Sequence, residues 1–204
     1  MAVGSWRHII QASFAGTQVS IRVLLRKLEQ CDPVLEIPGV SNQQSMALIQ
    51  QYEVVPARIG DAQQIATMSK RLVEAGLGWR WGPQRIVASI RNPERNVAVV
   101  RHGNRVIGFG IMEYGFESAH LLLFAVRPDC RRQKIGSRLL RWLEETALIA
   151  GVAAIYLEAR QNNPMARRFY EAHGYRQIEI VPGYYSGRES AVRMVRRLRS
   201  RASS

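Results

Sequence analysis

The stretch that decides the fold is FAVRPDCRRQKIGSRLL, residues 124–140, where an apolar run passes through a basic turn into an amphipathic helix. Arg131, Arg132 and Lys134 stand just ahead of Gly136 and the expected helix start. The first N–H groups of a helix have no partner within it, and together they attract anions. Because glycine lacks a Cβ, the backbone at Gly136 can approach a ligand closely. These residues alone allow two interpretations: a solvated basic turn, or a seat for a phosphorylated ligand.

Outward from this turn, the hydrophobic periodicity predicts an α/β domain with the element order β-α-α-β-β-β-α-β-α-β-β. Strands are expected at residues 52–57, 96–101, 105–113, 119–127, 153–160, 175–181 and 190–198. Helices are expected at residues 61–75, 79–90, 137–150 and 163–174. Asp61 is the expected N-cap of the first helix, and Asn163 that of the last, with Pro164 as its first residue. Residues 102–104, His-Gly-Asn, predict a hairpin between two of the strands.

The chain has 204 residues, which is enough for one domain with a sizeable core and an appendage. Hydrophobic residues make up 47% and charged residues 22%, as in ordinary globular proteins. The apolar runs, such as residues 121–126, are far shorter than the roughly 20 residues of a membrane helix, so no membrane partner is expected. Cys31 and Cys130 are the only cysteines. We therefore expect neither a disulfide framework nor a metal site, and the cysteine usage favours the cytoplasm.

The N-terminal part of the chain differs in pattern from the rest. Residues 20–28, SIRVLLRKL, place apolar side chains on one helical face, and residues 31–45 form a polar stretch with two prolines that is typical of a linker. Met46 is an alternative natural start, because a strand and a capped helix follow it. We expect an N-terminal extension at 1–50, the main domain at 51–200 and a tail at 201–204.

The formal net charge of the chain is +13. Such a charge favours anionic partners, and it fits a nucleic acid, an acidic membrane face or a polyphosphate cofactor without choosing among them. An excess of arginine also serves many proteins simply as a solubilising surface. The charge by itself therefore leaves the partner open.

Three stretches resemble the GNAT N-acetyltransferase family. FAVRPDCRRQKIGSRLL resembles its acetyl-CoA loop, Q/R-x-x-G-x-G/A after a strand, with Arg131 at the first position and Gly136 at the last. LEARQNNPMARRFYEAHGYR, residues 157–176, resembles the second signature, an acidic strand followed by an Asn and an A-x-x-x-Y-x-x-x-G-[FY] helix. GYYSGRESAVRM, residues 183–194, resembles the closing hairpin of the RimI-type ribosomal-protein-alanine N-acetyltransferases. The resemblance covers residues 52–198, and two signatures in the right order are far more specific than one.

The resemblance implies the GNAT fold, a mixed twisted sheet of six to seven strands with flanking helices, and acetyl-CoA as cosubstrate. Backbone groups of Phe124, Ala125 and Val126 would face the pantetheine arm. The loop that starts at Arg131 would bind the pyrophosphate through the backbone amides of Arg132, Gln133, Lys134, Ile135, Gly136 and Ser137. Asn163 matches a family position that touches the cofactor, and this role is compatible with its being a helix cap.

Lys134 departs from the family pattern, which usually has glycine at this position. A side chain there would hinder a backbone with positive φ but costs little when φ is negative. Because the rest of the loop is intact, we expect a negative φ, so that Lys134 adds a cation beside the phosphates.

Two residues match the catalytic positions of the ribosomal-protein-alanine acetyltransferases. Glu158, on an otherwise apolar strand, is the expected base that draws a proton from the amine, and Tyr170 is the expected acid that protonates the leaving thiolate. Without the resemblance, Glu158 would be an outward-facing acid pairing with Arg160, and Tyr170 a core aromatic beside Phe169. By family analogy, the N–H of Val126 is expected to polarise the thioester carbonyl.

The acceptor is expected between the segment of Trp79 and Trp81 and the loop of Tyr184 and Tyr185. Both are aromatic, stand near glycines and lie on connections, where specificity usually resides. The alternative for all four residues is ordinary packing under loops.

The leading function is acetyl transfer from acetyl-CoA to the N-terminal α-amine of a protein, and the resemblance implies a ribosomal protein as target. A second interpretation keeps the enzyme and changes the acceptor to a small-molecule amine, a Lys side chain or aminoacyl-tRNA. A third is a non-catalytic GNAT-like module that binds RNA or a protein through its arginines. A charge of +13 does not attract a basic ribosomal protein, but it suits CoA or the RNA around such a substrate.

Overall fold

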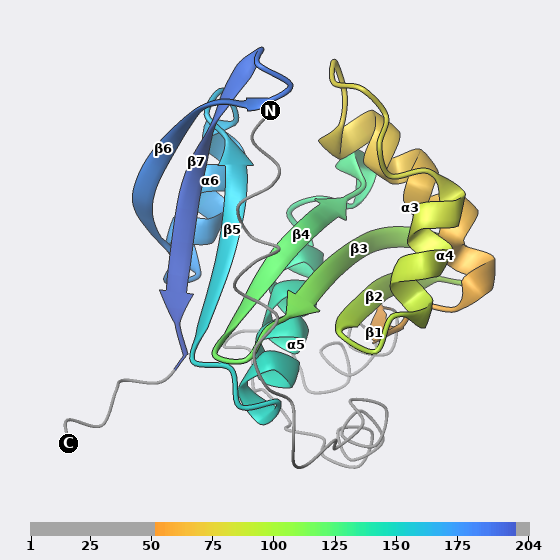
Figure 1. The fold of residues 1–204 in the computed structure, drawn as a ribbon. Helices are drawn as coiled ribbons and strands as arrows, with labels where there is room; N and C mark the ends of the chain where they lie inside the picture. Colours follow the sequence, from red (N-terminus) through yellow and green to blue (C-terminus); the bar gives the residue numbers. More distant parts are fainter. Residues whose placement is uncertain (1–51, 199–204) are drawn as a thin grey trace.

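The computed structural model describes residues 52–198, which form a mixed seven-stranded sheet with helices on both faces (Figure 1). The strand order is β1-β2-β3-β4-β5-β7-β6. The strands are β1 Glu53–Pro56, β2 Arg95–His102, β3 Arg105–Tyr114, β4 Ser118–Val126, β5 Ala154–Arg160, β6 Arg176–Tyr185 and β7 Glu189–Arg197. The expectations for the extension at 1–50, Met46 and the tail at 201–204 lie outside the described residues.

Helices cover both faces of the sheet. They are α3 Ala62–Met68, α4 Pro83–Arg91, α5 Ile135–Ile149 and α6 Pro164–Ala172, with shorter helical turns η1 Ile59–Asp61, η2 Ser69–Val73 and η3 Pro128–Cys130. Ile65 of α3 and Ile86 of α4 are buried in one cluster, while Leu139 and Leu143 of α5 and Tyr170 of α6 are buried in the other. The sheet therefore separates an α3–α4 face from an α5–α6 face. Among residues 52–198, no helix is long and apolar enough to cross a membrane.

The predicted strands are all present, although β6 differs at its end. It continues to Tyr185, so Tyr184 and Tyr185 belong to a strand and not to a connection. The helix predicted at 79–90 begins only at Pro83, and Gly82 before it is extended, with φ −69° and ψ 170°. A proline disfavours helical geometry in the residue that precedes it, which explains the later start.

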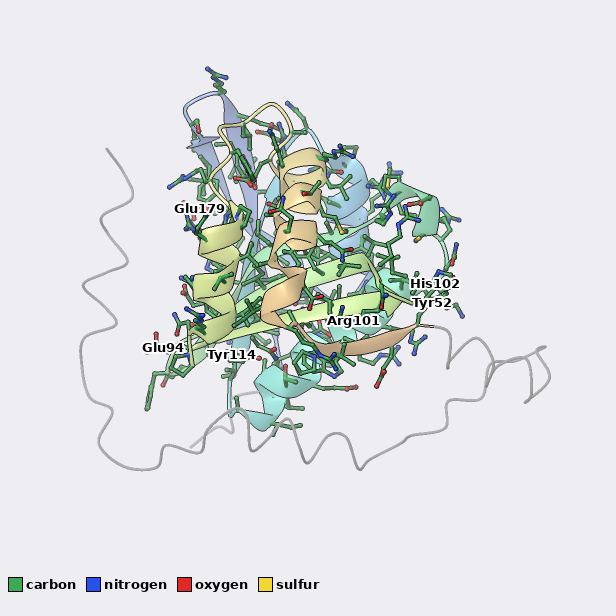
Figure 2. The ribbon with its side chains drawn as sticks, turned by 90° about the vertical axis from the view of Figure 1, so that its right-hand side faces the viewer. Tyr52, Glu94, Arg101, His102, Tyr114 and Glu179 are labelled. Atoms are coloured by element: carbon green, nitrogen blue, oxygen red, sulfur yellow. The ribbon has the colours of Figure 1, made fainter. Side chains whose placement is uncertain are left out.

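Asp61 occupies the N-cap position of α3, as predicted, but its side chain makes no capping hydrogen bond to that helix. Its buried carboxylate instead accepts the N–H of Arg58 at 2.6 Å and the Nη1 of Arg101 at 2.6 Å. Arg101 lies on β2 beside the start of α3 (Figure 2). The carboxylate thus caps the preceding turn η1 and also pairs with a cation from a neighbouring strand, because a buried carboxylate needs charge compensation as well as hydrogen bonds.

The strands β4 and β5 are the parallel pair of the sheet, joined by α5. They pair only over Ser118–Leu121 and Ala154–Leu157 and then diverge (Figure 1). We call the point where this pairing ends the fork. The carboxyl ends of parallel strands are the usual place for a ligand in α/β sheets.

Within residues 52–198, the backbone of β4 beyond the fork has no strand partner on its β5 side. The N–H of Arg127 donates to the carbonyl of Ile107 on β3 at 2.9 Å. Because N–H groups alternate in direction along a strand, those of Phe124 and Val126 turn toward β5, which no longer pairs with them. An extended ligand can bind along this edge as a short additional strand would.

Candidate functional site

The basic turn, residues 131–136, follows the carboxyl end of β4 and leads into α5. Within residues 52–198, none of the N–H groups from Arg132 to Ser137 donates to a protein acceptor. The first N–H in use is that of Arg138, which donates to the carbonyl of Lys134 at 3.0 Å. The exposed side chains of the turn are those of Arg131, Arg132, Gln133 and Lys134. Free backbone donors among exposed cations suit a diphosphate.

The backbone of this turn corrects one expectation. Lys134 has φ 58° and ψ 6°, in the left-handed region, and not the negative φ that the sequence predicts. Arg132 also has a positive φ of 65°. Alternation of right- and left-handed residues points successive N–H groups toward one side, which makes a concave site for anions. Lys134 therefore has a left-handed backbone that fits this arrangement of N–H groups, although a lysine ordinarily prefers a negative φ.

Gly136 allows the turn to lie close against α6. A Cβ at this position would stand 3.4 Å from the ring of Phe169 and 3.7 Å from Cγ2 of Val126. Asn163 is the N-cap of α6, as predicted, since its side chain accepts the N–H of Ala166 at 3.1 Å. The start of α6 and the basic turn thus lie next to the carboxyl ends of the two parallel strands.

Tyr170 projects from α6 into an aromatic cluster beside β4. Its ring packs edge-on against those of Phe124, Phe169 and Tyr175, with centroids 6.2, 5.3 and 5.6 Å away. Burial raises the pKa of Tyr170 well above its ordinary value, so the phenol keeps its proton at neutral pH. Within residues 52–198, its hydroxyl has no hydrogen-bond partner. Tyr170 is therefore a proton donor without an internal acceptor.

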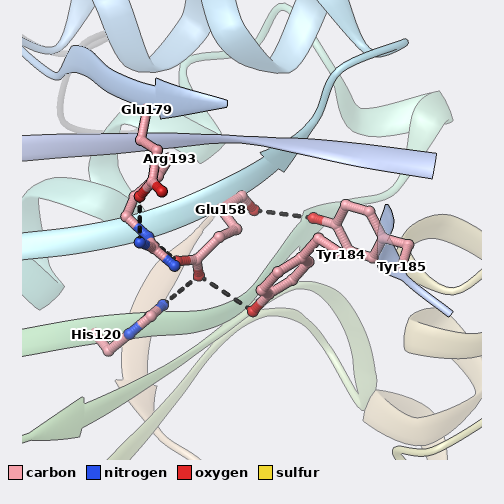
Figure 3. Close-up of polar contacts among 6 residues, drawn as sticks. All are labelled: His120, Glu158, Glu179, Tyr184, Tyr185 and Arg193. Carbon is pink, nitrogen blue, oxygen red and sulfur yellow. Dashed lines mark hydrogen bonds and ion pairs between the residues drawn. The ribbon is translucent and has the colours of Figure 1, made fainter. Parts of the chain in front are cut away.

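Glu158 lies at the fork, one residue beyond the last β4–β5 pair, and its side chain is only 6% exposed. Its carboxylate accepts hydrogen bonds from His120 Nε2 at 2.5 Å, Arg193 Nε at 2.8 Å and the Tyr184 hydroxyl at 3.4 Å (Figure 3). Burial acts to raise the pKa of Glu158, but the hydrogen bonds and charges of His120 and then Arg193 outweigh it and hold the pKa below its usual value. At neutral pH the carboxylate is ionised.

Glu158 and Tyr170 face opposite sides of β5. Leu157 and Ala159 belong to the buried cluster of the α5–α6 face that includes Tyr170, so Glu158 between them points to the other face. Tyr185 connects the two sides, because its hydroxyl donates to the Glu158 carbonyl at 3.2 Å. Burial raises the pKa of Tyr185 most, and the nearby tyrosines, Tyr170 included, and Glu158 add to this shift. The two predicted catalytic residues can act on one group only at the fork, where the sheet opens.

Arg160, at the end of β5, contacts both the segment before α4 and the end of β6. Its Nη1 donates to the carbonyl of Ala75 at 2.7 Å, and its Nη2 pairs with Glu189 at 2.6 Å. The guanidinium also lies over the ring of Tyr185, 5.9 Å from its centroid. The two segments predicted to flank the acceptor are therefore neighbours.

The two tryptophans take different positions in their segment. Trp79 is exposed, with Lys70 Nζ 4.8 Å from its ring centroid. Trp81 packs against the α3–α4 cluster, and Arg85 covers its ring at 4.2 Å. Among the described residues, the tyrosines hydrogen-bond to Glu158 and the tryptophans do not. Trp81 thus supports the segment, and Trp79 remains available at the surface.

Residues 67–175, more than half of the chain, match the model of the acetyltransferase (GNAT) family. The chain belongs to the GNAT acetyltransferase family. An uncharacterised N-acetyltransferase of Methanocaldococcus jannaschii is 40% identical over 96 residues, 46% of this chain and 60% of that relative. The ribosomal protein bS18-alanine N-acetyltransferase of Escherichia coli is 34% identical over 102 residues, 48% of this chain and 68% of that enzyme.

The crystal structure of the Escherichia coli ribosomal-protein-S18-alanine N-acetyltransferase superposes with a TM-score of 0.64 at 23% identity. The superposition covers 75% of this chain and 99% of the Escherichia coli chain, which confirms the GNAT fold predicted from the sequence. This GNAT protein is therefore an N-acetyltransferase, an enzyme that acetylates amines.

Sequence reasoning missed three residues around the carboxylate of this GNAT enzyme: His120, Arg193 and Glu179. Arg193 is the direct partner of Glu158 in the β5–β7 pairing, and it also pairs with Glu179 of β6. His120 lies on β4 opposite Tyr156 of β5, two residues from Glu158. The signal was a histidine within the apolar strand 119–127, but its meaning depends on strand register. Only the paired sheet brings these groups together.

Proposed function

We propose that this GNAT enzyme moves the acetyl group of acetyl-CoA to the N-terminal α-amine of a protein, and that a ribosomal protein is its natural target. The observation that carries the proposal is the set of hydrogen bonds from Tyr184 and Tyr185 to Glu158. These tyrosines belong to the hairpin that resembles the ribosomal-protein-alanine acetyltransferases. The similarity to the Escherichia coli enzyme over the same domain supports this acceptor.

Acetyl-CoA suits the donor groups that the fold leaves free. The backbone amides from Arg132 to Ser137 would hold the diphosphate, and the cations of the turn would add charge. The pantetheine arm would lie along the free edge of β4 from Phe124 to Val126, which faces the fork. Asn163, at the start of α6, would stand beside the arm.

The reaction needs a neutral amine, a polarised carbonyl and a proton for the leaving thiolate. The N–H of Val126 would donate to the thioester oxygen, where negative charge develops. Tyr170 would protonate the thiolate, and Glu158 would provide the negative charge that draws the proton from the amine. An N-terminal amine has a reference pKa of about 7.7–8.0, against about 10.4 for lysine, so a modest base is sufficient.

The acceptor would approach between Trp79 with Trp81 and Tyr184 with Tyr185. The chain's two separate cysteines fit a reducing compartment, and we place the enzyme in the cytoplasm. The net charge of +13 would let surface arginines contact RNA near a ribosomal substrate.

Acetyl-CoA turnover against a panel of amines tests this function. The panel contains N-terminal peptides of ribosomal and other proteins, peptides with a blocked N-terminus and a free lysine, small amines and aminoacyl-tRNA. We expect the highest kcat/KM with a free N-terminal peptide. Glu158→Gln and Tyr170→Phe should each lower kcat by about 10²-fold or more, the usual contribution of acid–base groups.

Other outcomes would replace this proposal. A preference for a small amine, a lysine or aminoacyl-tRNA would move the acceptor to that class while leaving the GNAT enzyme intact. RNA binding that weakens steeply with added salt, without acetyl transfer to any amine, would favour a binding module. Full activity of both variants would show that their catalytic roles are wrong.

A further inference from the structure

Six charged or ionisable side chains of alternating type cross the sheet, one from each of six strands. We call this set the charge row: Arg95, Glu113, His120, Glu158, Arg193 and Glu179, on β2, β3, β4, β5, β7 and β6. Arg95 pairs with Glu113, and Glu113 is the direct neighbour of His120 in the β3–β4 pairing. His120 binds Glu158, which binds Arg193, which binds Glu179 (Figure 3). The row has an imidazole at its centre.

Glu158 is poorly suited to hold the proton itself. Both carboxylate oxygens already accept hydrogen bonds, Oε1 from Arg193 and Oε2 from His120 and Tyr184. Its side chain is 6% exposed, against 38% for that of His120. A group that receives a proton from a substrate needs a free lone pair within reach of it. A substrate amine therefore has little access to the buried carboxylate of Glu158 and more access to the imidazole of His120.

His120 meets these requirements. In the neutral tautomer whose Nε2–H donates a hydrogen bond to Glu158, Nδ1 has no proton and keeps its lone pair. Within residues 52–198, Nδ1 has no hydrogen-bond partner. His120 also stands one residue before the last β4–β5 pair, at the fork. A carboxylate that holds one imidazole nitrogen fixes the tautomer and stabilises the imidazolium, as in catalytic triads.

We propose that His120 is the proton acceptor of the acetyl transfer and that Glu158 is its positioning residue; this deepens the proposed function. As the amine nitrogen bonds to the acetyl carbon, it loses one proton to Nδ1 of His120, directly or through one water. The C–S bond then breaks, and the thiolate takes a proton from Tyr170, which regains one from solvent. The imidazolium, hydrogen-bonded to Glu158, releases its proton to solvent after the product leaves.

Several groups other than His120 titrate or carry charge on this surface. The groups that face His120 come from five other strands of the sheet. They are Arg95 of β2, Glu113 of β3, Tyr156 and Glu158 of β5, Arg193 of β7 and Tyr184 of β6. Arg85 of α4 interacts electrostatically with Arg95 and Glu113. A change in the pH profile is therefore assigned to His120 only if it follows the substitution of that residue.

The test is the pH dependence of kcat/KM, measured with whichever amine the wild-type enzyme acetylates fastest. Histidines usually produce an acid limb between pH 5 and 8. We expect His120→Gln, whose amide can still donate to Glu158, to lower kcat about 10²-fold or more and to remove this limb. The KM for acetyl-CoA should not change. Glu158→Gln should lower kcat but keep the limb, because the imidazole that accepts the proton is still present.

The matched control is His102→Gln, the same substitution on an exposed histidine that, among residues 52–198, packs its ring against Tyr52 and makes no polar contact with its side chain. It should retain wild-type activity, and unfolding midpoints of all variants should show that the fold is kept. A wild-type acid limb in His120→Gln, or its loss in Glu158→Gln alone, would assign the proton to Glu158 and overturn the proposal. Because any acetylated amine serves, failure of the N-terminal acceptor leaves this test valid.

Discussion

At the scale of single residues, Lys134 and Arg132 adopt a backbone geometry that residues with a Cβ ordinarily avoid. Both hold positive φ angles in a turn where the N–H groups from Arg132 to Ser137 have no acceptor within residues 52–198. The left-handed region is unfavourable for residues with a Cβ, and glycine occupies it without this cost. The family pattern has glycine where this chain has Lys134. The lysine therefore keeps the geometry at an energetic cost and adds a cation beside the expected diphosphate.

Lys134→Gly should raise the free energy of unfolding by about 1 kcal/mol, because it removes the strain of a left-handed side chain. The KM for acetyl-CoA should stay the same or rise, since the backbone donors are kept and one charge is lost. Chemical denaturation and steady-state kinetics measure both effects. Arg131→Gly, at a residue with φ −71°, is the control and should bring no gain in stability. A large gain in cofactor affinity for Lys134→Gly would show that the lysine obstructs binding.

At the scale of the element, Asp61 at the start of α3 combines a local cap of η1 with a tertiary ion pair. The Asp61 carboxylate is 5% exposed and binds both Nη atoms of Arg101, from the adjacent β2. It also accepts the N–H of Arg58, which fixes the entry into the helical turn. This carboxylate holds the first helix of the domain against the sheet.

Asp61→Ala should lower the free energy of unfolding by about 3 kcal/mol, because it leaves the guanidinium of Arg101 and a backbone donor without their partner. Urea denaturation followed by circular dichroism measures the change. The control is Asp129→Ala, which removes an exposed carboxylate that also contacts two arginines, Arg105 and Arg127. Solvent replaces that contact, so stability should not change. Equal effects of the two substitutions would contradict the structural role of Asp61.

At the scale of the whole molecule, Arg160 joins parts that are far apart in the sequence. It binds the carbonyl of Ala75 before α4, Glu189 at the start of β7 and the ring of Tyr185 at the end of β6. These contacts connect the two segments that we assign to the acceptor. Movement of one segment should therefore affect the other.

Arg160→Met keeps the aliphatic length of the side chain and removes its polar contacts. We expect faster hydrogen exchange in residues 75–82 and an acceptor KM raised several-fold, with an unchanged KM for acetyl-CoA. Hydrogen exchange followed by mass spectrometry and steady-state kinetics provide the measurements. Arg188→Met, in the exposed turn between β6 and β7, is the control and should behave as wild type. Unchanged exchange in Arg160→Met would show that the segments are held by other contacts.

Local sequence patterns determined most of the fold. The alternation of apolar residues predicted every strand of the described domain, and Asn163 before Pro164 predicted the start of α6. These features depend on neighbours a few residues apart, so the sequence contains the information directly. The two family signatures also predicted the turn that we assign to acetyl-CoA, and Glu158 and Tyr170 lie on the strand and the helix that the sequence predicted for them.

Only the tertiary structure decided the chemistry around Glu158. His120, Arg193 and Tyr184 reach it from three other strands, and their pairing depends on register, which no local pattern specifies. The same is true of the positive φ of Lys134, which follows from the arrangement of several N–H groups. Residues close in sequence determined the helices and strands. The electrostatic partners of a buried group come from other strands, and strand pairing in the sheet decides which ones reach it.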